Sequence, residues 1–344
     1  MVIIIREMAK DEAKLARDIG LASFEPVECL TFSKPTAALL ATVDEQIVGM
    51  ASYRIFSAKG GQKVGHVETA YVRKGFEGQG IGSRLYREVT DLLKKEGCET
   101  VTAIVKDDNV ASWKLFQNNG YYVVGFLEML RLYGFIAAVR LWFDSTLAVC
   151  TGFHMWATVP QKNSAPLGQL GLFLFLNVLI LLPGLLRVSL PQLGITACAL
   201  SLGLLTSVLG GWLATLCSPR RWDFRVAIGG LLVSLIITAM GGIFPIVGRF
   251  YPREYEHTPE FRRAMGLEGL GHWLAILLLV IVAIVFRGQW AFGETLISIG
   301  ALLLLYYSLP FYPFQCFGGD RIWNCSKVLS TVTVSISLVL HYLV

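Results

Sequence analysis

Over the first 130 residues, short β-branched runs alternate with amphipathic stretches, a pattern typical of a domain with both strands and helices. The apolar and β-branched runs predict strands at 2–5, 37–43, 47–56, 64–72, 100–105 and 121–127. Apolar residues at helical spacing predict helices at 10–23, 81–96 and 109–117. Asp107 or Asp108 is the expected N-cap of the last helix. The order of these elements predicts an α/β domain over residues 1–130.

Beyond residue 131, long apolar runs replace this alternation. Runs of this length predict membrane spans at about 167–186, 193–216, 226–247, 272–286, 295–309 and 328–344. The stretch 132–159 is also apolar but carries Arg140, Asp144 and His154, so it is either an interfacial helix or a poor span. The expected organisation is an α/β domain at 1–130, this helix and a linker at 131–165, and an all-α polytopic membrane domain of about six helices at 166–344.

The composition supports this division. The 344 residues are 54% hydrophobic and only 16% charged, which departs from average soluble usage. Residues 1–130 hold 16 Lys and Arg against 17 Asp and Glu, whereas the remainder holds 14 against 8. Basic charge beside apolar spans suits anionic lipid headgroups, and no basic run interleaved with aromatics indicates nucleic-acid binding.

The cysteines indicate neither disulfides nor a metal ribbon. The seven are scattered and form no C-x-x-C pair, so we expect reduced thiols. The stretch Met1–Glu7 becomes charged too early for a signal peptide, and we expect it to contribute the first strand.

The stretch 72–82, Val-Arg-Lys-Gly-Phe-Glu-Gly-Gln-Gly-Ile-Gly, lies between an expected strand and an expected helix. Glycines let a backbone approach an anion closely, and a helix N-terminus directs unpaired N–H groups at it. The spacing resembles the acetyl-CoA pyrophosphate loop of the Gcn5-related N-acetyltransferases, Arg/Gln-x-x-Gly-x-Gly/Ala. Gly80 and Gly82 match its two glycines, whereas Glu77 replaces the usual Arg or Gln. Arg73, Lys74 or Arg84 are candidates to compensate for the missing donor.

A second segment, Asn109 to Tyr121, resembles the family pattern Asn-x-x-Ala-x-x-Leu-Tyr-x-x-x-Gly-Phe. The order of the strands and helices also resembles that of the family, so the resemblance covers about residues 3–128 and implies the acetyl-CoA-binding fold of that family, a mixed central sheet flanked by helices. The resemblance implies the following acetyl-CoA contacts: Tyr71, Val72, Glu77, Gly78, Gln79, Gly80, Ile81, Gly82, Ser83, Arg84, Asn109, Ser112 and Phe116.

The family reaction is direct attack of an amine on the thioester, with backbone N–H groups of the preceding strand orienting the acetyl group. Glu68 is the first candidate for the general base and His66 the second. The family often has a tyrosine as general acid where this chain has Phe116, so the candidate acid is Tyr121, Tyr122, Tyr71 or water. Each of these side chains also has a purely structural interpretation, as a solvated carboxylate, a surface histidine or a core tyrosine.

Residues 168–344 carry a weaker resemblance. The segment from Leu309 to Asn324 is similar to the Leu-Pro-x-x-Pro-x-Asp-Gly segment of site-2-protease-like membrane metalloproteases. The chain has no H-E-x-x-H motif, and Asp320 is shifted from the position of the family's metal ligand. This resemblance therefore implies a metal-free domain, and no metal is expected.

Two functions remain open at this point. The first is a membrane-embedded, acetyl-CoA-dependent N-acetyltransferase that acts on a primary amine, with its α/β domain in the cytoplasm. Its partners would be acetyl-CoA, the lipid bilayer and an unidentified amine, for which a membrane-borne molecule is one candidate, without nucleic acid. The alternative is an acetyl-CoA-binding sensor or adaptor, with weak or no catalysis, coupled to a protease-like but inactive membrane domain.

Overall fold

The computed structural model describes residues 2–24, 32, 34–106, 109–160, 166–227, 229–256, 258–290 and 292–344. The expected N-cap residues Asp107 and Asp108 lie outside this set. The chain divides into two compact units, each described by itself below. Unit 1 comprises Met1–Val105, Ala111–Leu147 and His154–Gln161, and unit 2 comprises Lys106–Val110, Ala148–Phe153 and Lys162–Val344.

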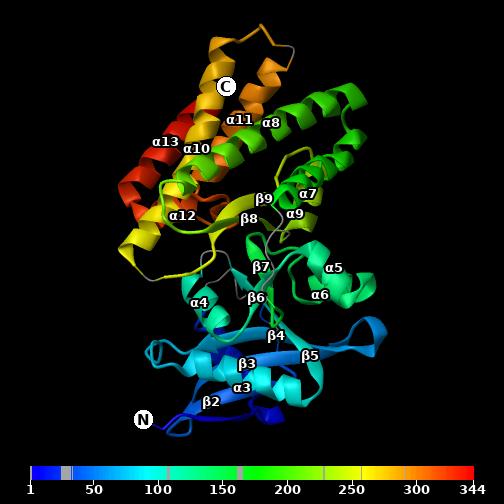
Figure 1. Ribbon diagram of the computed structural model, residues 1–344, viewed down its shortest axis with the longest axis vertical. Coiled ribbons are helices and arrows are strands. Elements are labelled where there is room, and N and C mark those ends of the chain that lie inside the picture. Colours follow the sequence, from blue (N-terminus) through cyan, green and yellow to red (C-terminus); the bar gives the residue numbers. More distant parts are fainter. Residues whose placement is uncertain are drawn as a thin grey trace. The chain divides into compact units, whose positions relative to one another are not determined.

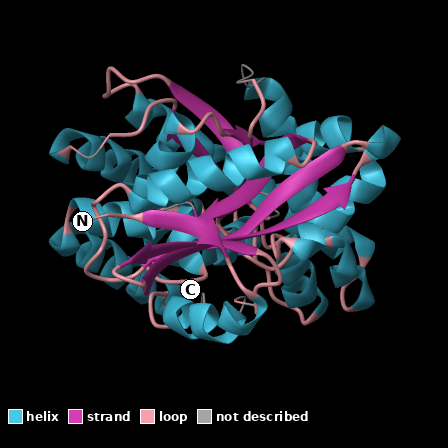
Figure 2. Cartoon of the chain, turned by 90° about the horizontal axis from the view of Figure 1, so that it is seen from below, coloured by secondary structure: helices cyan, strands magenta, loops and turns pink. Residues whose placement is uncertain are grey.

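Unit 1 is built on a seven-stranded sheet of order β1-β2-β3-β4-β5-β7-β6, whose strands twist relative to one another (Figure 2). Its strands are β1 (Ile4–Glu7), β2 (Ala38–Val43), β3 (Gln46–Ser57), β4 (Lys63–Val72), β5 (Cys98–Lys106), β6 (Tyr122–Val124) and β7 (Phe153–Ala157). Its helices are η1 (Lys10–Glu12), α1 (Ala13–Leu21), η2 (Lys59–Gly61), α3 (Ile81–Lys95), α4 (Val110–Asn118), α5 (Phe126–Tyr133) and α6 (Phe135–Asp144). Neighbours β4 and β5 are parallel, whereas β1 to β4 pair antiparallel.

Helices cover both faces of this sheet. Helix α3 lies along one face (Figure 1), where Gly65 of β4 leaves room for Leu93. Helix α1 lies against the other face, where the hydroxyl of Tyr71 donates to the carbonyl of Ala16 over 2.6 Å. Apolar residues at helical spacing in α3 therefore bury one stripe against the strands, as their pattern predicts.

The domain boundary predicted at residue 130 lies before the last strand of the sheet. The region 132–159 is neither one interfacial helix nor a span: it forms α5, α6 and then β7, which inserts between β5 and β6. The strand Phe153–Ala157 is almost wholly buried, so it lacks the alternation that marks a half-exposed strand. Consequently, the apolar composition of this buried strand resembles that of a membrane-spanning segment.

Unit 2 is mainly helical. Its helices are α7 (Pro166–Leu179), η3 (Leu182–Leu186), α8 (Leu190–Thr215), α9 (Leu231–Ala239), α10 (Pro259–Val285), α11 (Gly293–Ser308), η4 (Phe314–Phe317), α12 (Gly319–Cys325) and α13 (Lys327–Leu343). Helix α10 packs against α8, α11 and α12. At its crossing with α8, Gly210 and Gly271 bring the two backbones so close that neither position has room for a Cβ atom.

Three of the described helical segments are long and apolar enough to cross a bilayer: Pro166–Leu186, Leu190–Thr215 and Pro259–Val285. Helices α11 and α13 are apolar but shorter. The span expected at 226–247 is wrong, because this region holds the end of β8 (Trp222–Ala227), the nine-residue α9 and the start of β9 (Val247–Pro252), and β8 pairs with β9. Gly241, Gly242 and Pro245 follow α9 directly and prevent one continuous helix.

A buried ion network joins three elements of unit 2. The carboxylate of Glu268 in α10 is fully buried and accepts from Arg249 of β9 at 3.0 Å and from Arg321 of α12 at 2.7 Å. It also accepts from the backbone N–H of Phe250 at 3.1 Å and contacts Nε2 of His272 at 3.0 Å. Each charge is thus paired and hydrogen-bonded, as a low-dielectric interior requires.

Asp320 belongs to the edge of this network, since its carboxylate lies 3.7 Å from Arg249. Within the described residues, no group of three or more His, Cys, Asp or Glu side chains could hold a metal ion. Guanidinium groups therefore supply the positive charge around Glu268 and Asp320.

Candidate active site

The parallel ladder between β4 and β5 ends before either strand does. Its last pair in the described residues is Val67 with Ala103, whereas β4 continues to Val72 and β5 to Lys106. The register between β3 and β4 shifts where Ser52 pairs with Thr69 and Tyr53 with Val67, so that Glu68 is the extra residue of a bulge. Backbone groups of β4 beyond Glu68 that face β5 are consequently free of that ladder, and a ligand can use them.

The glycine-rich turn follows directly. Gly75, Gly78 and Gly80 have positive φ, and Gly80 (φ 76°) precedes α3 in the left-handed conformation. No side chain caps the first turn of α3, so its N–H groups are available to an anion. A Cβ atom on Gly78 or Gly80 would meet nothing within 4 Å. Both glycines therefore border open space at the helix N-terminus, which suits the diphosphate of a nucleotide.

Glu77 contacts its own loop. Its Oε2 accepts from the backbone N–H of Gly75 at 2.8 Å. The Glu77 carboxylate therefore stabilises the turn through this hydrogen bond. In the family, the residue at this position instead donates to the phosphates. Arg84 is engaged as well, since its Nη1 donates to the carbonyl of Ile3 at 3.2 Å. Arg73 and Lys74 are exposed beside the turn and are the available cations.

The other expected coenzyme contacts divide into two groups. Gln79 is exposed at the turn, and Ser83 is half-buried in the first turn of α3, where each can reach a bound anion. Ile81 is buried, and Val72 packs beside Gly82. These two residues therefore pack beneath the backbone of the turn and support its conformation. Asn109 is exposed immediately before α4, and Ser112 is half-buried in its first turn.

Phe116 and Tyr121 lie in an aromatic cluster of the core. The Phe116 ring lies 4.6 Å from that of Tyr86 and 4.9 Å from that of Tyr121, centroid to centroid. The Tyr121 hydroxyl lies 2.7 Å from Oγ1 of Thr90, and burial raises the pKa of this tyrosine. Tyr71 is similarly buried, its hydroxyl is bonded to Ala16, and burial raises its pKa too. These positions favour packing over ligand contact for Phe116 and over proton donation for both tyrosines.

Glu68 and His66 lie in a charged cluster to which β3, β4 and α6 contribute. Arg54 Nη2 lies 2.6 Å from Oε1 of Glu68, and its Nη1 lies 3.9 Å from Oδ2 of Asp144. Arg140 in turn binds Asp144 at 3.2 Å, four residues along the same helix. Sequence patterns do not identify Arg54 as the partner of Glu68, because cross-strand neighbours depend on the register.

His66 is 3% exposed, and its Nδ1 lies 2.9 Å from Oγ1 of Thr102 on β5. Its Nε2 is buried and has no hydrogen-bond partner among the described residues. Burial, assisted by the charge of Arg54, lowers the pKa of His66 to about 4. The imidazole is therefore neutral at pH 7, and its structural interpretation as a surface histidine is wrong.

This shift predicts loss of stability of unit 1 in mild acid. The unfolded chain binds the proton at His66 with a pKa near 6.5, whereas the folded chain binds it only near 4. Stability contributed by neutral His66 is thus complete above pH 6.5 and falls as the pH drops towards 4. At about 1.4 kcal/mol per pKa unit, the loss reaches about 2 kcal/mol at pH 5.

Hydrogen exchange of β4 peptides, corrected for the intrinsic pH dependence of exchange, measures this loss. A His66→Asn variant is expected to show a shallower decline between pH 7 and pH 5. Equal declines in the two proteins would contradict the assignment.

Comparisons with known proteins give a family match and several similar solved structures. The family model "Acetyltransferase (GNAT) family" matches residues 7–121. Among solved structures, a GNAT-family acetyltransferase from Streptococcus pneumoniae is 19% identical, with 36% of this chain and 86% of that chain covered and a TM-score of 0.31. An acetyltransferase of the same family from Elizabethkingia anophelis with acetyl-CoA bound is 16% identical, with coverages of 36% and 77% and a TM-score of 0.30.

A third structure, the IAA acetyltransferase from Bacillus cereus, is 15% identical, with coverages of 45% and 98% and a TM-score of 0.32. Among curated proteins, none matches this chain. The family match ends at Tyr121, and the similarity of residues 168–344 to membrane metalloproteases is not shown. Residues 7–121 therefore form an acetyltransferase domain of the GNAT family, whose general activity is acetyl transfer.

Proposed function

We propose that the protein is an acetyl-CoA-dependent N-acetyltransferase that acetylates a primary amine. The observation that carries this proposal is the uncapped N-terminus of α3 behind a positive-φ glycine turn, directly after the point where β4 and β5 stop pairing. The N-terminus of α3 provides an anion site for the coenzyme diphosphate. The unpaired part of β4 provides backbone N–H groups for the acetyl carbonyl. Helix α3 thus binds the diphosphate of the coenzyme, and β4 positions its acetyl group.

In the proposed reaction the neutral amine attacks the thioester carbonyl. Glu68 accepts the proton that the ammonium must lose, directly or through water. Backbone N–H groups of residues 68–72 stabilise the oxyanion, and one such donor typically contributes about 10²–10³ in rate. The C–S bond then breaks, the amide forms, and coenzyme A leaves as its thiolate. Because thiols have a pKa of about 8.5, this leaving group needs no dedicated acid.

The buried tyrosines favour one alternative. Neither Tyr121 nor Tyr71 has a free hydroxyl, and Phe116 cannot donate a proton. A domain without a positioned acid is also compatible with a sensor that binds acetyl-CoA and turns it over slowly or not at all. Release of free coenzyme A in the presence of a panel of amines distinguishes the two: only the enzyme releases it in proportion to acetylated product.

The helical unit supports a membrane location, with unit 1 in the cytoplasm, where acetyl-CoA is made. Helix α6 adds to this argument, since Phe135 and Ile136 at its start are 71% and 83% exposed. Exposed Arg131 and Arg140 lie on α5 and α6 and suit anionic headgroups. We therefore place α6 at the bilayer surface and the acceptor among amines that are in or near the membrane.

A valine at position 80 tests the coenzyme site. Gly80→Val is expected to weaken acetyl-CoA binding by about 100-fold or more, because it displaces a diphosphate from at least two charge-assisted hydrogen bonds of roughly 1.5–3 kcal/mol each. Calorimetry with acetyl-CoA measures the affinity. Gly60→Val is the matched control, because Gly60 has a similar φ of 74° and equally open surroundings, but in the η2 turn. Unchanged affinity in Gly80→Val would exclude this site.

A further inference from the structure

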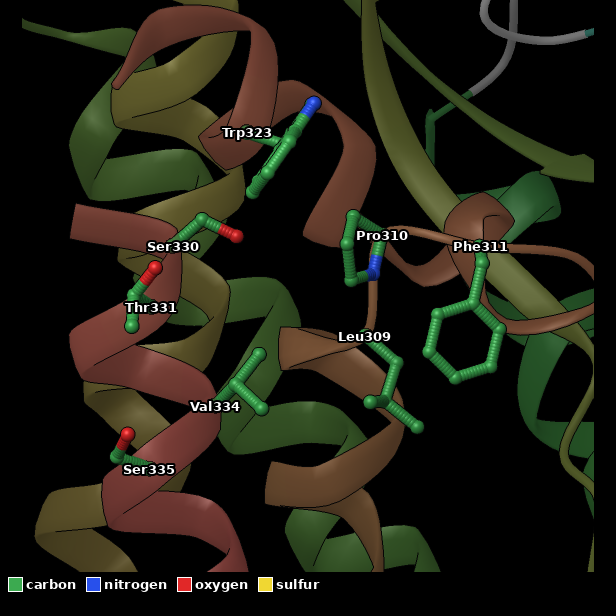
Figure 3. A pocket seen from close by; sticks show the side chains of 8 residues that line it. All are labelled: Leu309, Pro310, Phe311, Trp323, Ser330, Thr331, Val334 and Ser335. Carbon is green, nitrogen blue, oxygen red and sulfur yellow. The ribbon is translucent and has the colours of Figure 1, made fainter. Parts of the chain in front are cut away.

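A pocket of about 250 Å³ opens on unit 2 between the end of α11, α12 and α13 (Figure 3). Its walls are mostly apolar, and Leu309, Pro310, Trp323 and Val334 contribute to them. A whole drug-sized ligand usually occupies roughly 300–1,000 Å³. This pocket is therefore sized for one segment of a larger, mainly apolar molecule.

One polar group in the pocket lacks a partner. Ser330 of α13 is 1% exposed, and its hydroxyl has no hydrogen-bond partner in the described part of the chain. Figure 3 shows this hydroxyl pointing into the middle of the pocket. Neighbouring hydroxyls on the same helix are satisfied, since Thr331 donates to the carbonyl of Lys327 at 2.9 Å and Ser337 to that of Leu304 at 3.1 Å. A buried hydroxyl without a partner is destabilising, so a ligand with an acceptor oxygen fits here.

The positive charge of Lys327 lies about one helical turn before Ser330 on α13. Lys327 begins α13, and its Nζ lies 5.5 Å from the centroid of the Trp323 ring. Ser330 follows Lys327 by three positions, which corresponds to a rise of about 4.5 Å along the helix axis. Tryptophan and lysine together are typical of the membrane–water interface. Along α13, the cation Lys327 beside the lining residue Trp323 is thus followed by the Ser330 hydroxyl and then by the apolar Val334 of the pocket wall.

This order is the order of groups in a glycerophospholipid: phosphate, ester carbonyl and acyl chain. We propose that the pocket binds one anionic phospholipid, with the phosphate at Lys327, an ester carbonyl accepting from Ser330, and the first part of an acyl chain between Leu309 and Val334. The proposal rests on the membrane location of unit 2 proposed above. It assigns unit 2 a specific lipid contact in addition to its role as an anchor.

Quenching of Trp323 fluorescence by phosphatidylglycerol with brominated acyl chains tests the site in the full chain in detergent micelles. The Trp323 signal is obtained as the difference between the wild type and a Trp323→Phe variant. We expect saturable quenching of this signal. Ser330→Ala is expected to raise the half-saturating lipid fraction about two- to tenfold, the range for loss of one hydrogen bond. Lys327→Gln is expected to remove the preference for phosphatidylglycerol over phosphatidylcholine.

Thr331→Val is the matched control, because Thr331 lines the same pocket but its hydroxyl is already bonded to the backbone. This variant is expected to bind like the wild type. Quenching that does not saturate, or that is equal in Ser330→Ala and Thr331→Val, would overturn the lipid site. Extraction of the chain from membranes by alkaline carbonate would instead refute the membrane location, so the two failures are distinguishable.

Discussion

Replacing Glu268 by alanine is expected to destabilise unit 2 by about 3–5 kcal/mol, the usual cost of removing one partner from a buried ion network. The variant leaves the guanidinium groups of Arg249 and Arg321 buried without their shared carboxylate. The N–H of Phe250 loses its acceptor as well. Unfolding in mixed micelles titrated with dodecyl sulfate measures the change.

Glu294→Ala is the matched control. Glu294 makes two hydrogen bonds of 2.8 and 2.9 Å to Arg287, a geometry comparable to that at Glu268, but both side chains are exposed. Because exposed pairs contribute little, this variant is expected to unfold like the wild type. A similar small effect in both variants would show that the Glu268 network does not hold the unit together.

A triple variant separates charge from packing. Arg249→Met, Glu268→Leu and Arg321→Met together remove all three charges and keep comparable volume. Buried ion triads replaced in this way are often as stable as the original. The triple variant is therefore expected to regain most of the stability that Glu268→Ala loses. If it is less stable than Glu268→Ala, packing or the bonds to backbone carbonyls dominate.

Glu68→Gln is expected to lower the acetylation rate at neutral pH by about 10²–10⁴-fold, the usual contribution of a general base. Acetyl-CoA affinity is expected to stay nearly unchanged, because the coenzyme site lies at the glycine turn. Glutamine keeps the shape of the side chain and can still accept from Arg54. Coenzyme A release across pH, combined with calorimetry, separates the loss of rate from loss of binding.

Asp144→Asn is the control for this prediction. Asp144 is the other carboxylate near Arg54, at 3.9 Å rather than the 2.6 Å of Glu68. We expect this variant to keep most of the rate, since it leaves Glu68 and its guanidinium partner in place. A Glu68→Gln protein with full rate at every pH would show that another group or bulk water takes the proton.

The sequence predicts the core of unit 1 well because its signals are local. The strand before the turn, the start of α3 after Gly80, and the helix α4 all follow from patterns within about ten residues. The addition of β7 to the sheet is not local. Three of its five residues, Met155, Trp156 and Ala157, pair with β6 across α5 and α6, and the apolar composition of the strand is equally compatible with a membrane segment.

The candidate site shows the same division. The glycine turn and Glu68 were predicted from their spacing. The surroundings of Glu68 and His66, by contrast, depend on strand register and on α6, which bring in Arg54, Thr102 and Asp144. In unit 2, Glu268 meets partners 19 and 53 residues away in sequence. No periodicity within α10 identifies such partners, so the network could be found only from the fold.

The position of Arg321 near the end of the chain has a consequence for biosynthesis. A ribosome completes Arg249 before α10 and Arg321 only after α11, so at the membrane location proposed for unit 2 Glu268 would enter the bilayer with one of its two guanidinium partners. Until α12 emerges, that carboxylate lacks its shorter hydrogen bond, the 2.7 Å contact from Arg321. A chain released early therefore carries an incompletely neutralised charge among lipids. Quality-control proteases are expected to degrade such truncated chains before the full-length protein.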